Sequence, residues 1–214
     1  MVLSIGHAQS GYRRAVRSGD RPAVRGRRQV SAVRAKSLFT VAAFDIKRQN
    51  YVTFDPNDAF NPRATGEIHS RGLEFEAVAE LADGLNVIAA YTWLPVFEIT
   101  KSADADEIGK REPTVPKHMA SLWLHQRLGY GQFAGFGFGG GVRYVGETFG
   151  DIANTTRMRV PGYTLFDAVI DYEKDGWRVA LNVRNIADKA TLKCWDTCYY
   201  GEGRTIIASA RRRW

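Results

Sequence analysis

The sequence contains no apolar run that approaches the roughly 18 to 20 residues of a membrane-spanning helix. It therefore excludes a transmembrane helix. Its mean hydropathy of -0.30 does not exclude a transmembrane β-barrel, because barrel strands alternate between apolar and polar residues and their average hydropathy stays low. The N-terminal stretch MVLSIGHAQS has no basic region followed by an apolar core, so no signal peptide is visible.

Motifs that carry chemistry are also scarce. Four histidines are scattered along the chain and the only cysteines are Cys194 and Cys198, so no metal-ligand spacing can be recognised. Asp104, Asp106 and Glu107 lie close together but lack the register of a calcium-binding loop, which indicates a solvated loop. Serine, histidine and aspartate residues occur without a nucleophile elbow or a triad context. We therefore expect no enzyme, no cofactor and no metal site.

Acidic residues are nearly absent from the N-terminal segment. Residues 1–36 hold nine basic residues and one acid, whereas residues 37–214 hold 21 basic and 22 acidic residues, so the net charge of +7 comes from the first segment. This segment is rich in arginine and lacks a clear period, which predicts disorder or a piece foreign to the fold. A basic arm that binds nucleic acid is an alternative, although the aromatic residues that stack on bases are missing.

From Ser37 onward, apolar and polar residues alternate with the period of two that is typical of half-buried strands. Leu73 and Phe75 share one face of such a strand, and Glu74 and Glu76 share the other. Eight strands of about ten or more residues are expected. They lie in SLFTVAAFDIKRQ, EIHSRGLEFEAVAEL, LNVIAAYTWLPVFEIT, KHMASLWLHQRL, the glycine-rich stretch described below, GYTLFDAVIDYE, WRVALNVRNIA and RTIIASARRRW.

The connections between these strands alternate strictly between short and long. The short ones lie at 83–84, 129–131 and 175–176, and the long ones lie near 49–66, 100–116, 150–161 and 188–203. An outer-membrane barrel has this arrangement, with short periplasmic turns and long extracellular loops. A soluble β-sandwich has no reason to gather its long loops at one end, but it remains the alternative.

In a barrel, the two faces of each strand have different surroundings. Polar positions would face a wet lumen: Glu74, Glu76, Asp167, Asp171, Arg178 and Arg184. Aromatic residues near strand ends would form the interfacial girdles: Tyr91, Trp93, Tyr144, Phe149, Trp177 and Trp214.

The stretch AGFGFGGGVRYVGETFG matches the G-x-G-x-x-G pattern of dinucleotide-binding proteins. That motif requires a helix to open at the third glycine, whereas the residues that follow here are β-branched or aromatic. The stretch is therefore predicted to be a barrel strand. Its glycines permit close approach toward a filled lumen, and its phenylalanines face lipid. The glycines expected to share the lumen face are Gly135, Gly137, Gly139 and Gly141.

Several segments, taken in order, carry a resemblance to a known family. They are SLFTVAAFDIKRQNYVT, GEIHSRGLEFEAVAEL, NVIAAYTW, VPKHMASLW, GGGVRYVGETFGD, VPGYTLFDAVIDYE, VALNVRNIADK, KCWDTCYYGEGRTIIAS and the terminal aromatic residue. Residues from about 37 to 214 resemble the C-terminal end of a TonB-dependent siderophore receptor of the ferric-hydroxamate (ferrichrome) type. Residues 1–36 match no part of the family pattern.

The resemblance implies an all-β, antiparallel transmembrane barrel of about 22 strands in the bacterial outer membrane, plugged by an N-terminal domain. Such a receptor binds a ferric siderophore outside the cell and imports it with energy transmitted by TonB. About eight C-terminal strands of that barrel would be present here, without the plug or the segment that contacts TonB. We therefore expect a truncated receptor that does not transport siderophore alone. Its implied partners are a ferric siderophore, outer-membrane lipid and the barrel assembly machinery.

The resemblance also assigns roles to residues near the C-terminus. Cys194 and Cys198 would lie in an oxidising extracellular loop, where a disulfide is expected, and the family often has a bridge there. Tyr199 and Tyr200, beside this bridge, are expected to contact the ferric siderophore. Trp214 is expected to be the C-terminal signal that the barrel assembly machinery reads.

The position of Arg212 departs from the family pattern, which usually has an aromatic or apolar residue there. A lipid-facing arginine costs about 2 to 4 kcal/mol at the membrane midplane but little near the interface. Because Arg212 lies two residues from the end of the sequence, we expect it near the interface.

Overall fold

The computed structural model describes the backbone of residues 24–34, 37–55 and 58–214, and the side chains of residues 37–53 and 66–214. The long strands are β1 (Val24–Arg34), β2 (Ser37–Asp55), β3 (Asp58–Ala82), β4 (Leu85–Lys101), β5 (His118–Arg127), β6 (Phe136–Val145), β9 (Tyr163–Lys174), β10 (Trp177–Arg184) and β13 (Thr205–Arg212). The short elements are β7 (Thr148–Phe149), β8 (Arg159–Val160), β11 (Leu192–Trp195), β12 (Thr197–Tyr200) and the 3-10 turns η1 (Ala105–Glu107), η2 (Gly131–Phe133) and η3 (Thr156–Met158).

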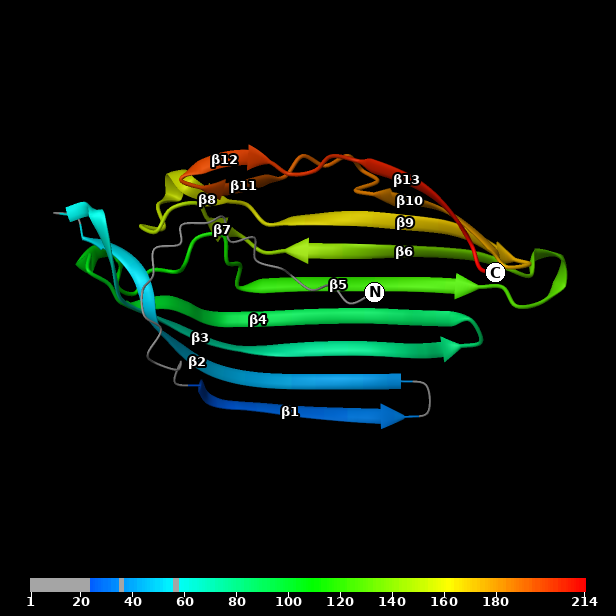
Figure 1. Ribbon diagram of the computed structural model, residues 1–214, viewed down its shortest axis with the longest axis horizontal. Coiled ribbons are helices and arrows are strands. Elements are labelled where there is room, and N and C mark those ends of the chain that lie inside the picture. The colour runs from blue at the N-terminus through cyan, green and yellow to red at the C-terminus, as the bar shows by residue number, and fades with distance from the viewer. Residues whose placement is uncertain (1–23, 35–36, 56–57) are drawn as a thin grey trace.

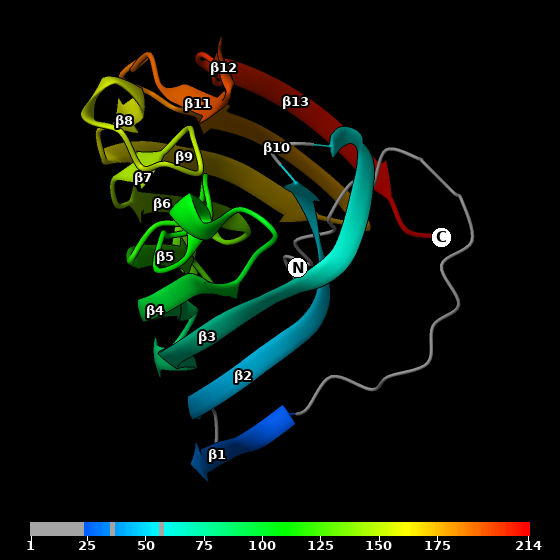
Figure 2. The same ribbon diagram turned by 90° about the vertical axis from the view of Figure 1, so that its left-hand side faces the viewer.

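The long strands form one nine-stranded sheet in the order β1-β2-β3-β4-β5-β6-β9-β10-β13, in which every neighbouring pair is antiparallel. Figure 1 shows these strands side by side, and the end-on view in Figure 2 shows the sheet curved into an open arc. The predicted all-β antiparallel architecture is confirmed, and the alternative of a sandwich of two packed sheets is wrong. No described helix is long and apolar enough to cross a membrane.

The sheet contains one strand more than the sequence predicts. For residues 1–36 the sequence predicts disorder or a piece foreign to the fold; residues 24–34 form β1 and pair with β2, for example at Val33↔Leu38, so disorder is wrong for these eleven residues. The many arginines and the lack of a clear period give no strand signal in the sequence, but the backbone of this segment pairs with the edge of β2. The rest of that segment, residues 1–23 and 35–36, lies outside the described residues.

Two connections also differ from their predicted lengths. The long loop expected near 49–66 is mostly a continuation of β2 and β3, which pair as far as Asp55↔Asp58 with register shifts along the way. Figure 2 shows the far end of this hairpin bending across the concave side of the sheet. The link between β5 and β6 covers residues 128–135 and includes η2, so it is longer than the predicted turn. Backbone pairing therefore outweighs the turn-forming composition of residues 50–66.

The two ends of the sheet differ. Asp175 and Gly176 both have positive φ angles of 49° and 78°, which is the backbone of a tight two-residue hairpin, and Gly84 has a φ of 73° in the turn between β3 and β4. The short pairs β7–β8 and β11–β12 lie at the opposite end, the left-hand end of Figure 1. We call these the turn end and the loop end.

The two faces of the sheet also differ, and the alternation in the sequence predicts how. On one face, large apolar side chains are about half exposed, among them Phe138, Phe166, Ile170, Val179 and Ile206. On the other face, charged side chains of β5 and β9 meet over β6, which lies between them, and the Asp171 side chain is fully buried. Because side chains diverge on the convex side of a curved sheet and converge on its concave side, the apolar face is convex and the charged face is concave. A large exposed apolar face of this kind marks a surface that contacts a protein or a membrane.

Candidate functional site: the charged concave face and the loops at its end

A cluster of charged side chains surrounds Asp171 on the concave face. Nε2 of His125 lies 2.7 Å from Asp171 Oδ1, and Arg127 Nη2 donates a hydrogen bond of 2.5 Å to Asp171 Oδ2. Arg178 adds a longer ion pair of 3.7 Å from the other side. A Cβ on Gly137 would lie 2.6 Å from Asp171 Oδ1 and 2.9 Å from His125 Nε2. The glycine of β6 therefore allows side chains of β5 and β9 to meet over it.

A second ion pair lies nearer the loop end. Arg143 Nε and Nη2 donate to the two carboxylate oxygens of Asp167 at 2.6 and 2.9 Å, a bidentate pairing. The backbone N–H of Asn185 donates to the same carboxylate at 2.9 Å, which ties the end of β10 to β9. Opposite Asp167, a Cβ on Gly141 would collide with the ring of Trp123. The glycines of β6 thus make room for side chains on the concave face, as the sequence predicts.

Beside this ion pair lies a polar pocket of about 180 Å³. Its charged lining comes from Arg143, Arg184, Lys193 and Glu202, with Tyr163 beside them. Arg184 and Glu202 are 3.8 Å apart and both are more than half exposed, so this pair contributes little. Among the described residues, no ion pair joins Lys193 to an acid. The pocket therefore offers hydrogen-bond donors and an excess of positive charge.

The segment between β4 and β5 is held in place by one arginine. Arg111 Nη2 donates to the carbonyl oxygens of Leu94 at 2.7 Å and Pro116 at 3.1 Å, and Arg111 Nε donates to Val115 O at 2.9 Å. The backbone N–H of Arg111 donates to Asn154 Oδ1 at 2.7 Å, and Asn154 Nδ2 donates back to Arg111 O at 2.8 Å. These contacts join two separate loops into one layer at the loop end.

The same layer contains a buried carboxyl group, that of Glu112 in the segment between β4 and β5. Tyr51 Oη donates to Glu112 Oε1 at 2.9 Å, while Glu112 Oε2 is buried and has no hydrogen-bond partner. Burial raises the pKa of Glu112 above its ordinary value. Burial, together with the nearby Glu112, also raises the pKa of Tyr51. The geometry favours a protonated Glu112, since a carboxylate would leave a buried charged oxygen without a partner.

Cys194 and Cys198 lie opposite each other on β11 and β12 and are joined by a disulfide. Cys194 is buried against the β7–β8 loop, where a Cβ on Gly150 would lie 2.5 Å from Cys194 Cβ. The backbone N–H of Asp196 donates to Gly150 O at 2.6 Å. The disulfide hairpin is therefore packed onto its neighbouring loop.

Tyr199 and Tyr200 follow the disulfide on β12, and their side chains are 68% and 81% exposed. They pair with Lys193 and Leu192 on β11, but only Lys193 of these four residues lines the polar pocket. The tyrosines thus lie beside the pocket and not within it. The alternating pattern does place Asp167 and Arg184 on the pocket side, but it does not single out Arg143 or Lys193, which depend on pairing between distant strands.

Trp214 lies at the turn end beside two other side chains. The guanidinium carbon of Arg212 lies 4.4 Å from the centre of the Trp214 ring and 5.3 Å from that of Trp177, which is the cross-strand partner of Arg212. Arginine stacked on tryptophan at such distances is a cation–π contact. Arg212 is therefore placed where its charge can remain at the edge of the apolar band.

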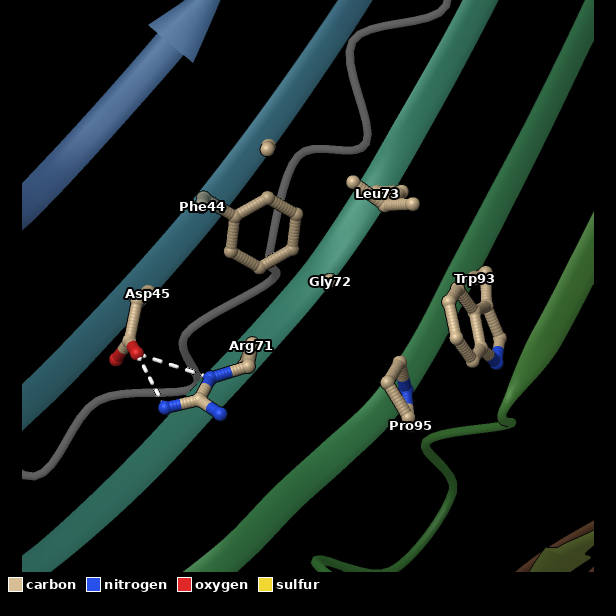
Figure 3. Close-up of a pocket in the computed structure, with 8 residues that line it drawn as sticks. Phe44, Asp45, Arg71, Gly72, Leu73, Trp93 and Pro95 are labelled. Carbon is tan, nitrogen blue, oxygen red and sulfur yellow. Dashed lines mark hydrogen bonds and ion pairs between the residues drawn. The ribbon is translucent and has the colours of Figure 1, made fainter.

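The apolar band of the convex face ends near the loop end at a charged group. His69 Nε2 lies 2.8 Å from Asp45 Oδ1, and Arg71 Nε and Nη2 donate to Asp45 Oδ2 at 2.9 and 2.7 Å. Figure 3 shows the Asp45–Arg71 pair at the rim of a hollow of about 430 Å³ that also involves Trp93 and Pro95. A register shift between β3 and β4 accompanies this hollow, next to a proline that has no N–H to pair.

The part of the chain that the structure describes contains no group of three or more metal-ligating side chains. Each histidine there has a different neighbour: His69 lies by Asp45, His118 by Tyr91 and His125 by Asp171.

Comparison with known proteins gives one consistent family. The family model described as "TonB dependent receptor-like, beta-barrel" matches residues 31–186. The matched region begins within β1. The ferrichrome outer membrane transporter/phage receptor of Escherichia coli (strain K12) is 35% identical over 184 residues, covering 82% of this chain and 24% of the relative. The ferrioxamine B receptor of Salmonella typhimurium (strain LT2) is 35% identical over 182 residues, covering 81% of this chain and 25% of the relative.

Among solved structures, the siderophore receptor PiuA from Acinetobacter baumannii superposes with a TM-score of 0.71 at 26% identity, covering 86% of this chain and 27% of that one. The ferric yersiniabactin uptake receptor FyuA from Yersinia pestis superposes with a TM-score of 0.72 at 17% identity, a likeness of fold alone. The chain spans about a quarter of the length of the curated relatives it matches.

Proposed function

Because this chain belongs to the TonB-dependent receptor-like β-barrel family, we propose that it forms part of the wall of an outer-membrane receptor that takes up ferric siderophores of the hydroxamate class. The observation that carries this proposal is a single curved sheet with an apolar convex face and a charged concave face. Such a sheet separates lipid from an aqueous interior. The names of two relatives, a ferrichrome transporter and a ferrioxamine receptor, support the hydroxamate class, since both compounds bind iron through hydroxamate oxygens.

The convex face supplies the contacts with outer-membrane lipid in this proposal. Trp214 supplies the signal that the barrel assembly machinery reads, and TonB engages the receptor through a segment elsewhere in full-length relatives. The alternative of a basic arm that binds nucleic acid has less support, because residues 24–34 of the basic segment are paired as a strand of the sheet.

The ligand contacts of this chain are proposed at the loop end. Hydroxamate and amide oxygens accept hydrogen bonds, and lysine and arginine side chains are donors only. Lys193 and Arg184 at the polar pocket, and the exposed Tyr199 and Tyr200 beside it, can donate to such oxygens. The disulfide between Cys194 and Cys198 holds the tyrosines close to the pocket.

A chimeric receptor tests the proposal. Residues 37–214 replace the matched part of the E. coli ferrichrome transporter, in a strain that lacks its own hydroxamate receptors. We expect uptake of iron from ferrichrome or ferrioxamine that requires TonB, and no uptake from a catecholate chelate. We also expect that residues 1–214 expressed alone support no uptake, because most of a relative's length is not represented.

Two results would contradict the proposal. A chimera that reaches the outer membrane in normal amount but imports no ferric hydroxamate would argue against the ligand class. Uptake by residues 1–214 alone would argue against a role as one part of the wall. Within a working chimera, replacing Lys193, Tyr199 and Tyr200 together by alanine should weaken ligand binding and leave the amount of inserted receptor unchanged.

A further inference from the structure

The polar pocket at the loop end holds more positive charge than its own residues neutralise. Arg143 is taken up by its bidentate pairing with Asp167. Arg184 has one ion pair among the described residues, the 3.8 Å contact with Glu202, and the Glu202 side chain is 78% exposed. Lys193 forms no ion pair with any described acid. Three positive charges therefore face two negative ones, and one positive charge remains unbalanced.

Two hydroxyl groups of the pocket also lack a partner. Thr191 lines the pocket and is only 6% exposed. Among the residues that the structure describes, neither the hydroxyl of Thr191 nor that of Tyr163 forms a hydrogen bond. A Cβ on Gly201 would collide with Thr191 Oγ1, so this wall of the pocket needs a residue without a side chain. Because buried polar groups are normally hydrogen-bonded, the Thr191 hydroxyl indicates that an acceptor enters the pocket.

The lining is suited to an anion of low charge. Lysine and arginine side chains are donors only, and each hydroxyl can donate one hydrogen bond, so the group that completes the pocket is an acceptor. One unbalanced positive charge matches a carboxylate, which carries a single negative charge, better than a phosphate group, which carries about 1.5 to 2 at pH 7. The planar guanidinium of Arg184 can also donate two parallel hydrogen bonds to a carboxylate.

The size of the pocket limits what can enter it. Its volume is about 180 Å³, whereas pockets that enclose a small organic ligand have volumes of about 300 to 1,000 Å³. A whole ferric siderophore therefore cannot fit inside, but one end of it can. The iron-bound part would then remain outside the pocket, near the exposed Tyr199 and Tyr200.

We infer that the pocket binds a terminal carboxylate of the ferric siderophore. Lys193 and Arg184 pair with this carboxylate, and the hydroxyl of Thr191 donates a hydrogen bond to one of its oxygens. The buried Cys194, joined by a disulfide to Cys198, fixes the position of the neighbouring Lys193. The inference rests on the proposed function and deepens it, because it adds a charged end group to the ligand class. Such a receptor prefers an acidic siderophore to a neutral or cationic one with the same iron centre.

Three forms of one linear trihydroxamate chelate test this preference. Their iron centre is identical, and the free end carries an ammonium group, its acetyl amide or its succinyl amide, which ends in a carboxylate. Their dissociation constants are measured by calorimetry with the purified chimeric receptor that contains residues 37–214. We expect the succinylated form to bind about tenfold more tightly than the acetylated form, and the ammonium form to bind least tightly.

Lys193→Glu reverses the sign of the charge at an exposed position, so it should not disturb the fold. In this variant the ammonium form should bind more tightly than the succinylated form. Arg184→Gln should weaken binding of the succinylated form about tenfold and change binding of the acetylated form by less than about twofold. Lys189→Glu is the matched control, because Lys189 is an exposed lysine of the same connection that does not line the pocket, and it should leave the order of affinities unchanged.

Four results would overturn the inference. Equal affinities for the three chelates would do so and leave the proposed function standing. A preference for the succinylated form that persists in Lys193→Glu would place the carboxylate elsewhere. A fall in the amount of inserted receptor for Arg184→Gln, with no change in the three affinities, would show that the pocket holds an acidic side chain of the receptor itself. If none of the chelates binds a chimera that reaches the outer membrane in normal amount, the proposed function fails and the inference fails with it.

Discussion

Gly137 of β6 and Asp171 of β9 are directly opposite each other, and the space where a Cβ of Gly137 would lie is occupied by the carboxylate of Asp171. The same carboxylate reaches His125 on β5 across this glycine. One glycine therefore decides whether side chains from two strands that are not neighbours can meet on the concave face.

Replacement of Gly137 by alanine should destabilise the sheet. The added methyl group would lie 2.6 Å from Asp171 Oδ1, and overpacking of this kind costs about 1 to 3 kcal/mol. Gly140→Ala is the control, because its Cβ would make only an ordinary contact of 3.7 Å. Denaturant unfolding of the membrane-embedded protein should show a lower midpoint for Gly137→Ala only. Equal midpoints for the two variants would refute this role of Gly137.

Asp171→Asn should also be destabilising, since it removes the charge that faces Arg127 and His125. Loss of a hydrogen bond to a charged group costs about 1.5 to 3 kcal/mol. Glu173→Gln removes the other acid near Arg127, but the Glu173 side chain is 39% exposed and its pair should contribute only about 0 to 1 kcal/mol. The same unfolding measurement compares the two variants. A larger effect for Glu173→Gln would contradict the assignment of Asp171 as the centre of the cluster.

Replacement of both Cys194 and Cys198 by serine should loosen the loop end and leave the sheet intact. The disulfide closes a loop of only five residues, for which chain entropy predicts a contribution of about 2 kcal/mol. The amide of Asp196, which is bonded to Gly150 O, should exchange its hydrogen faster, and protease should cleave near residues 192–200. Hydrogen exchange in β9 should not change. Unfolding of the entire sheet would show that the bridge has a wider role.

The contact between Glu112 and Tyr51 should weaken as the pH rises. The folded-state pKa of Glu112 is raised by burial above 4.5, so its contribution is fully present below about pH 4.5 and is lost as the pH rises through the higher folded pKa. Glu112→Gln keeps an oxygen that can accept from Tyr51 and cannot become charged, so the loop of this variant should be insensitive to pH. Hydrogen exchange of the Glu112 backbone amide, which donates to Phe97 O, measures the effect. An increase in the protection of this amide from about pH 5 to about pH 8 in the unmodified protein would contradict the prediction, because the contact is expected to weaken with rising pH.

Trp214→Ala should reduce the amount of chain inserted into the outer membrane several-fold, if the assembly machinery reads the terminal aromatic residue. Trp177→Ala is the matched control, because Trp177 shares the cation–π contact with Arg212 but is not at the end of the sequence. Quantification of the chimeric receptor in outer-membrane fractions compares them. Similar losses for both variants would indicate that Trp214 acts only through its contact with Arg212.

Much of the wall of this protein can be predicted from its sequence because alternation is a local property. A strand turns successive side chains to opposite faces, so Phe138 and Gly137 must lie on different sides whatever the neighbouring strands are. The same rule places Asp167, Asp171 and Arg184 on the charged face. The expected disulfide between Cys194 and Cys198 has a different basis, the oxidising loop and the family resemblance, and the β11–β12 hairpin that carries it is seen only in the structure.

The neighbours of each strand are decided by the tertiary structure. Arg143 pairs with Asp167, 24 residues away, and Tyr51 pairs with Glu112, 61 residues away, and no local pattern selects either pair. Likewise, β1 and the far ends of β2 and β3 form because their backbone groups find partners in the sheet, against an arginine-rich or loop-like composition. The sequence by itself determined which face each side chain takes, because that depends on the backbone of one strand. Only the tertiary structure decided which side chains meet, because register and curvature arise from pairing between segments that are far apart in the chain.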